Sequence, residues 1–335
     1  MFSFFRVLTI AFLFFLNPLY AEPISKPYGT VEVMEADDGS SFVWLKITSR
    51  VDEDGLSSAL RDAQSHGPVT QLAIYDARDL SGIAPISGLK LTFLEIHDIP
   101  PIIDLSPLER VPLTDLSLYG MSGGPSDLSA LRGLPLSSLG LIGLHDLSDL
   151  DPLDGVPINN LYLGDLPALT DLSALRGMPL ESLHLSGLDS LSDLAPLAET
   201  PMSGLVLNNL PVLADLSPLA KVPLDRLTLV SLPEVQDISP LAGMPITFLQ
   251  IVELPISSIG PIGDLRLGFL QLHDLPEVAD FSPLARCGAH TMVLGQLPGL
   301  TDLAPLAELS PKDLTIDGLP QLSNLHGIPG KRLQQ

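Results

Sequence analysis

The segment Pro179–Thr200, PLESLHLSGLDSLSDLAPLAET, recurs with little change along most of the chain. Aligning the 335 residues with themselves gives a period of twenty-two, with one step of twenty-three around Gly123 and one of twenty-one near Ile256. Such a period predicts a repeat architecture. The units begin at Pro68, Lys90, Pro112, Pro135, Pro157, Pro179, Pro201, Pro223, Pro245, Arg266, Gly288 and Ser310.

Within each unit, the pattern LxxLxL alternates as expected for a short strand with one buried face. The remaining leucines fall where a chain that turns back on itself would direct them inward. The apolar surface of one unit is too small to offset the conformational entropy lost on ordering it. The units must therefore stack, so that neighbours share one core, and we expect a solenoid of about twelve coils.

The strand segments LESLHL, DRLTLV and NNLYLG resemble the signature of leucine-rich repeats. The return segment DLSPL resembles in particular the short, bacterial, internalin-like class. The resemblance covers residues 68 to about 330 and implies an α/β repeat solenoid. Such a solenoid is a horseshoe or arc with a parallel concave sheet and short 3-10 or helical turns on its convex side.

The sequence departs from this family at the strand exit. The family usually has asparagine or cysteine there, whereas this chain mostly has leucine followed by proline, as in Leu210-Pro211. We therefore expect a rigid, apolar turn in place of the family's asparagine ladder.

The segments outside the repeats suggest an exported protein. Residues 1–21 combine Arg6, an apolar run from Val7 to Leu16 and a small residue, Ala21, at a suitable cleavage point. This pattern is typical of a secretory signal peptide, although an uncleaved anchor is the alternative. We predict a periplasmic or secreted protein with no stable membrane insertion after cleavage, and a short polar tail at residues 331–335.

Residues 22–67 are expected to cap the first coil. GTVEVMEADDGSSFVWLKI predicts a β-hairpin that turns at Asp37 to Gly39. DGLSSALRDAQSHG predicts a short amphipathic helix that ends at Gly67. Its buried face would contain Leu56, Ala59, Leu60 and Ala63.

The charge and the cysteine count limit the classes of partner. The formal net charge is −23, which disfavours nucleic acid and anionic membranes and makes a basic partner or a cation easier to accommodate. One cysteine, Cys287, excludes an intramolecular disulfide framework. It occupies a position that is Val, Met or Leu in most units, which favours a core role over a reactive thiol.

An aspartate recurs at the return turn of most units, and two hypotheses explain it. Asp215 and its copies could cap a short helical turn by accepting a hydrogen bond from the backbone N–H two residues later, at Ser217. The alternative is a row of calcium ligands, although DLSPL offers only one carboxylate per unit. The copies are Asp104, Asp127, Asp149, Asp171, Asp193, Asp237, Asp280 and Asp302, with Asn324 in the last unit.

The residues between the strand leucines form the candidate binding face. Positions four, six and eight of each unit should face outward, and exposed aromatic side chains on a rigid sheet are typical of protein-binding surfaces. Packing of the phenylalanines under a neighbouring loop is the alternative. The candidate partner-binding residues are Tyr75, Phe93, His97, Tyr119, Tyr162, His184, Arg226, Phe248, Phe269 and His273.

Position nine adds an acidic rim that could steer a basic partner or could simply be a solvated edge. Its acids are Asp76, Asp98, Asp165, Glu253 and Asp274.

Catalysis has little support in the sequence. His97, His184 and His273 belong to widely separated coils, so they cannot share a metal or form a catalytic dyad. The chain has no GxSxG, HExxH, P-loop or dinucleotide-binding motif. We predict a non-enzymatic protein without a cofactor that binds a protein partner through the concave sheet. A calcium-dependent structural or adhesive protein is the alternative.

Overall fold

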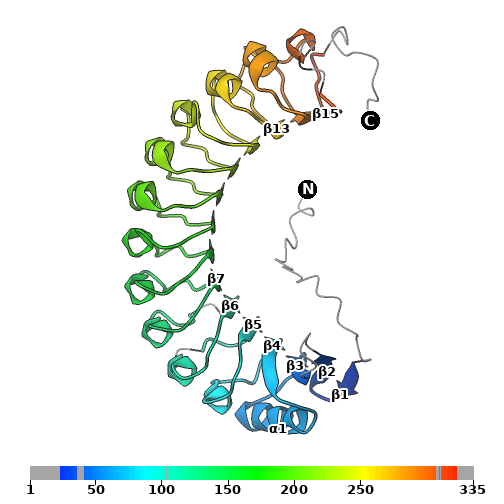
Figure 1. Cartoon of the computed structure of the whole chain (residues 1–335), viewed down its shortest axis with the longest axis vertical. Coiled ribbons are helices and arrows are strands. Elements are labelled where there is room, and N and C mark those ends of the chain that lie inside the picture. The colour runs from blue at the N-terminus through cyan, green and yellow to red at the C-terminus, as the bar shows by residue number, and fades with distance from the viewer. Residues whose placement is uncertain are drawn as a thin grey trace.

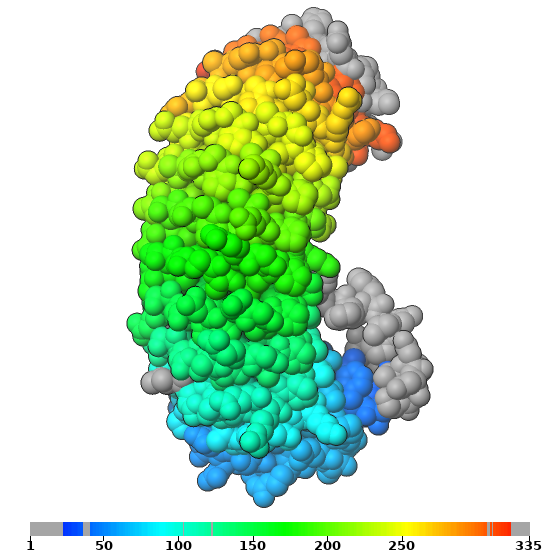
Figure 2. Space-filling model, turned by 60° about the vertical axis from the view of Figure 1, so that its left-hand side comes forward, coloured from blue at the N-terminus to red at the C-terminus, as the bar shows by residue number. Residues whose placement is uncertain are grey.

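The computed structural model describes residues 23–35, 41–102, 104–121, 123–306, 309 and 311–322. The predicted signal peptide, the hairpin turn at Asp37 to Gly39, Asn324 and the C-terminal tail lie outside these residues. The described chain forms an open arc with its strands on the inner side and its short helical turns on the outer side (Figure 1). The convex side is a stack of adjacent bands that follow one another in chain order (Figure 2).

Twelve parallel strands correspond to the twelve predicted units. They are β4 (Val69–Tyr75), β5 (Phe93–His97), β6 (Asp115–Tyr119), β7 (Ser138–Ile142), β8 (Asn160–Gly164), β9 (Ser182–Ser186), β10 (Gly204–Asn208), β11 (Arg226–Val230), β12 (Phe248–Val252), β13 (Phe269–His273), β14 (Thr291–Gly295) and β15 (Asp313–Asp317). Each strand pairs with the next so that equal positions of adjacent units lie side by side, as in Leu205 beside Leu227. The predicted solenoid and its concave parallel sheet are confirmed.

Short 3-10 turns carry the chain back along the convex side. They are η1 (Ala84–Ile86), η2 (Ser106–Leu108), η3 (Ser129–Leu131), η4 (Asp151–Leu153), η5 (Ser173–Leu175), η6 (Ala195–Glu199), η7 (Ser217–Lys221), η8 (Ser239–Leu241), η9 (Gly260–Asp264), η10 (Ser282–Arg286) and η11 (Ala304–Leu306). Most of them have proline in the first turn, where no backbone donor is needed.

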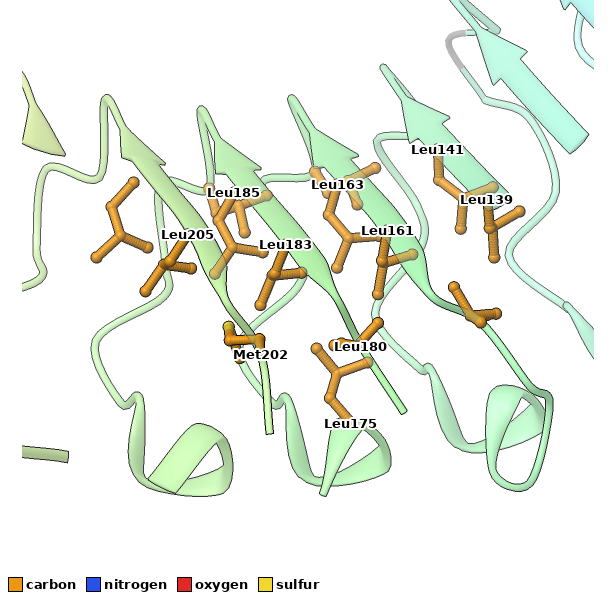
Figure 3. Close-up of a cluster of buried hydrophobic side chains, with 14 of the residues drawn as sticks. Leu139, Leu141, Leu161, Leu163, Leu175, Leu180, Leu183, Leu185, Met202 and Leu205 are labelled. Carbon is orange, nitrogen blue, oxygen red and sulfur yellow. The ribbon is translucent and has the colours of Figure 1, made fainter. Parts of the chain in front are cut away.

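One continuous core fills the space between the sheet and these turns. Leu183 and Leu185 of β9 and Leu175 of η5 are fully buried, and their side chains enter the same interior (Figure 3). Buried and half-buried residues alternate along β5, β6, β9, β12 and β13, which matches the predicted pattern. The core therefore passes from coil to coil without a break.

The hairpin and helix expected before the repeats are present, and they extend the sheet itself. Strand β2 (Gly29–Glu35) pairs antiparallel with both β1 (Ile24–Lys26) and β3 (Ser41–Ile47), whereas β3 runs parallel to β4. Helix α1 (Glu53–Gln64) begins with the Asp52 carboxylate accepting the Gly55 N–H at 2.8 Å. The four predicted residues of its apolar face are buried. The cap is thus continuous with the concave sheet.

A left-handed residue ends every repeat strand. Position nine has positive φ in all twelve units, at Asp76, Asp98, Gly120, Gly143, Asp165, Gly187, Asn209, Ser231, Glu253, Asp274, Gln296 and Gly318. Its N–H still bonds to the next strand, as from Asn209 to the Val230 carbonyl at 3.0 Å. Because glycine, asparagine and aspartate tolerate this conformation best, the backbone accounts for part of the acidic rim.

The expected turn at the strand exit follows position nine directly. Leu210 is fully buried, and its carbonyl accepts the Leu213 N–H at 3.3 Å. Pro211 therefore occupies the second place of a four-residue turn, where its fixed φ fits. Together with position nine, this turn brings the chain out of the strand and toward the convex side.

Candidate partner-binding face

The side chains at positions four, six and eight lie on the open, concave side of the sheet, as predicted. All ten candidate residues are half-buried except Arg226, which is exposed. They do not form one cluster. The structure brings them together in separate groups along the arc.

The first group is a stack of three rings in the first three coils. Tyr75, His97 and Tyr119 occupy position eight of adjacent strands. The ring centroids of Tyr75 and His97 are 5.2 Å apart, and those of His97 and Tyr119 are 4.1 Å apart and stacked. The rings face one another along the sheet, so their edges are what they present to the concave space.

Glu95 holds this stack in place. Its carboxylate accepts a hydrogen bond from the Tyr75 hydroxyl at 2.9 Å, and its Oε1 lies 2.7 Å from His97 Nε2. Burial raises the pKa of Glu95, but the hydrogen bonds with His97 and Tyr75 outweigh burial and leave the pKa below its ordinary value. Burial, followed by the charge of Glu95, raises the pKa of Tyr75. The site therefore holds a carboxylate and a neutral phenol.

Two further rings continue this arrangement at position six. Tyr162 and His184 lie on adjacent strands with centroids 4.2 Å apart. Burial lowers the pKa of His184 to about 4, so this imidazole is neutral at neutral pH. Burial, and then the charge of Asp165, raise the pKa of Tyr162.

Glycines leave room for these rings to lie along the sheet. A Cβ at Gly140 would be 3.2 Å from the Tyr119 hydroxyl, and one at Gly164 would be 2.8 Å from Tyr162 Cε1. The ring of His273 similarly lies where a side chain at Gly295 would be. The rings therefore occupy space that a side chain at these glycines would fill.

The remaining candidates lie at position four. Phe248 and Phe269 stack with centroids 4.5 Å apart and planes at 9°. Arg226 is beside Phe248 in the register, and Phe93 is beside Gln71 and Asp115 at the other end of the arc. The phenylalanine pair is thus a second aromatic group, separate from the first five rings.

Comparison with solved structures places this geometry in a known fold. An internalin, InlF, from Listeria monocytogenes superimposes with a TM-score of 0.64 over 86% of this chain and 85% of that chain, at 24% identity. The chain has the internalin fold. Internalin C2 from the same species is 24% identical over 63% of this chain and 83% of that chain, with a TM-score of 0.41. No family model matches the sequence, and no curated protein matches it.

In this internalin-fold chain, the recurrent aspartates form part of the return turns. Asp215 Oδ1 accepts the Ser217 N–H at 2.7 Å and Oδ2 accepts the Ser217 hydroxyl at 2.8 Å. All nine aspartates make the same backbone bond, at 2.7 to 2.9 Å. In the twenty-one-residue unit, Ser258 accepts the Gly260 N–H at 3.2 Å. The predicted capping interaction is confirmed as a turn of the Asx type.

The described residues give no support to the alternative hypothesis of a calcium-binding row. Within the described ranges, no group of three or more His, Cys, Asp or Glu side chains could hold a metal ion.

Cys287 is fully buried, as predicted for a core residue, and burial raises the pKa of its thiol. None of the described helices is long and apolar enough to cross a membrane.

Two residues of the concave face were not predicted. Because β3 is parallel to β4, Trp44 lies beside Gln71 and Lys46 lies beside Ala73. Lys46 Nζ is 3.8 Å from the Trp44 ring centroid and 3.3 Å from Glu32 Oε1. The Trp44 Nε1–H is buried and has no acceptor among the described residues. The alternation SFVWLKI, which matches that of the repeat strands, was the available signal.

Proposed function

We propose that this protein is an exported, non-enzymatic binding protein that recognises a protein partner through its concave sheet. One observation carries the proposal. Five aromatic rings, from Tyr75 to His184, pack as a group of three and a group of two on an open sheet face across six coils. Preorganised aromatic side chains bury much area at little entropic cost and are enriched at the energetic centres of interfaces.

The rest of the chain supports the same proposal. The internalin fold presents a long, curved sheet, and repeat solenoids use such surfaces for binding. The net charge of −23 favours a basic protein over nucleic acid or an anionic membrane. Residues 1–21 have the pattern of a signal peptide, which supports export to the periplasm or the medium.

Affinity capture with matched variants tests this function. The tagged protein without residues 1–21 is incubated with the envelope and secreted fractions of its own source, and the captured protein is then purified and titrated calorimetrically. The ring variant carries Tyr119→Ala, Tyr162→Ala and His184→Ala. We expect it to lose affinity for the partner by at least about 100-fold while keeping a cooperative thermal transition.

The control variant carries Arg176→Ala, Glu199→Ala and Lys221→Ala on the convex side. It should bind the same partner within about twofold of the unsubstituted protein, because exposed side chains outside an interface contribute little to affinity. Undiminished binding by a folded ring variant would place the interface elsewhere and refute the proposal.

A further inference from the structure

The charge of this chain is distributed unevenly between the two flanks of the concave sheet. We define the strand-exit flank as positions nine to twelve of each unit. It carries ten exposed acids: Asp76, Asp79, Asp98, Asp146, Asp165, Asp189, Glu234, Glu253, Asp274 and Glu277. Arg78 is the one lysine or arginine there, and His145 is the one histidine. The strand-entry flank, positions one to three of each unit, instead mixes Lys90, Arg266, His290 and Lys312 with Glu181 and Asp225. The return half carries the turn aspartates together with Arg110, Arg132, Arg176, Lys221 and Arg286.

Almost none of the acids on this flank is neutralised within the part of the chain that the structure describes. Arg78 Nη2 lies 3.2 Å from Asp76 Oδ1, and this pair is the flank's only salt bridge among the described residues. Asp98, Asp146 and Asp165 have no basic partner there. Their charges are therefore available to a ligand.

The fold does not require these charges. The left-handed backbone at position nine accepts glycine or asparagine equally well, as at Gly120 and Asn209. Glu253, with φ of 57°, is not a residue that this backbone favours. Position twelve lies in a turn that neutral residues also fill, as Val212 does. Local conformation explains small or flexible residues on this flank, but it does not explain a single sign of charge.

The five rings from Tyr75 to His184 lie next to the strand-exit flank. Tyr75 and His97, at position eight, directly precede Asp76 and Asp98 in the chain. The Asp165 carboxylate is near enough to Tyr162 to help raise the pKa of its hydroxyl. The first six coils thus present ring edges beside carboxylates of which, among the described residues, only Asp76 is in a salt bridge. Over five strand spacings, this surface is about 24 Å long.

We propose that the strand-exit flank of the first six coils docks an extended, Lys/Arg-rich segment of the protein partner. This inference rests on the proposed function and specifies the partner's chemistry. The basic side chains of the segment pair with Asp98, Asp146 and Asp165, and its apolar side chains contact the ring edges. An extended chain of about seven residues spans the length of this surface. A basic segment fits because it neutralises carboxylates that otherwise repel one another.

Fluorescence anisotropy with labelled decalysine as the probe tests the proposal. The flank variant carries Asp98→Asn, Asp146→Asn and Asp165→Asn, and asparagine tolerates the left-handed backbone at positions 98 and 165. The control carries Glu109→Gln, Asp154→Asn and Glu199→Gln, which change the net charge equally on the convex side. Labelled decaglutamate controls for the label and for peptide length.

In about 20 mM salt, we expect decalysine to bind the unsubstituted protein and the flank variant to bind it about tenfold more weakly. The control variant should stay within about twofold. Binding should weaken steeply by about 200 mM salt, because exposed charges are screened at that ionic strength. Equal losses in the two variants would indicate a response to net charge alone and would overturn the proposal, as would decalysine binding no more tightly than decaglutamate.

The partner captured in the ring-variant experiment separates this inference from the proposed function. The matched control is the variant with Glu109→Gln, Asp154→Asn and Glu199→Gln. If the flank variant binds that partner more weakly and this control does not, the flank contributes to docking. If the ring variant loses the partner while the flank variant retains full affinity, the concave face binds protein but the basic-segment inference is wrong. If neither variant loses affinity, the proposed function fails as well.

Discussion

At the scale of single residues, two positions in each unit set the path of the coil. The left-handed residue at position nine ends the strand, and the aspartate of the return turn begins the 3-10 segment. Position nine is polar or glycine, the turn residue is an aspartate in most units, and both positions act on the backbone. Specificity is left to the variable residues at positions four, six and eight and to the acids of the strand-exit flank.

Replacing Asn209 tests the left-handed position. Its φ is 50°, which a β-branched side chain adopts only with strain. We expect Asn209→Val to lower the free energy of unfolding by about 2 kcal/mol, whereas Asn209→Gly should change it by less than about 1 kcal/mol. Chemical denaturation of both variants measures the difference. Equal stabilities would show that this conformation is not required.

The pH dependence of stability tests the aspartate turns. Hydrogen bonds from Ser217 and Ser239 hold the pKa values of Asp215 and Asp237 below the ordinary value of 3.8. Because the folded pKa is the lower one, each carboxylate stabilises the fold above the unfolded pKa, and this contribution is lost as the pH falls through the folded pKa. We expect the double variant Asp215→Asn, Asp237→Asn to be less stable at pH 7 and to lose less stability between pH 5 and pH 3.

A double variant with Asp146→Asn and Asp189→Asn serves as the control for that experiment. Both residues are exposed and make no hydrogen bond with another described residue. Unfolding curves at a series of pH values should show the same acid dependence for this control as for the unsubstituted protein. A similar flattening in both double variants would mean that general charge repulsion, rather than the turns, sets the acid dependence.

At the scale of elements, each coil depends on leucines that no single unit can bury. Leu185 of β9 is fully buried between neighbouring coils. We expect Leu185→Ala to cost about 3 to 5 kcal/mol of unfolding free energy, because it leaves a cavity in a shared core. Val212→Ala, at a side chain that is 45% exposed, should cost less than about 0.5 kcal/mol. Denaturant titration would contradict the shared core if both changes cost the same.

The strands and turns of each coil can be predicted well from the sequence, because the spacing of the leucines follows the pattern of buried positions. It specified the strands, the return turns and the outward face, and even the hydrogen bond between Asp215 and Ser217. It did not predict that β3 joins the repeat sheet, since a hairpin can cap a solenoid without pairing with it. Nor did spacing reveal which rings meet. The stack of Tyr75, His97 and Tyr119 depends on register and on side-chain rotation.

At the scale of the whole molecule, each coil is stabilised by its contacts with the adjacent coils of the arc. Central coils have a neighbour on both sides, while β15 lies at the C-terminal end of the sheet order. Leu314 of β15 is 8% exposed, whereas the corresponding Leu183 of β9 is fully buried. We expect amide hydrogens of β15 to exchange at least about tenfold faster than those of β9. Mass spectrometry of exchanged peptides measures this, and uniform exchange would indicate one global unfolding unit.

The concave face is the central claim, and site-specific photo-crosslinking in the source cells tests it most directly. A photoreactive phenylalanine analogue is placed at Tyr162 on the concave face or at Ala220 on the convex side, where residue 220 is exposed. We predict one discrete protein adduct from position 162 and none from position 220. An adduct from position 220 together with none from position 162 would contradict the account.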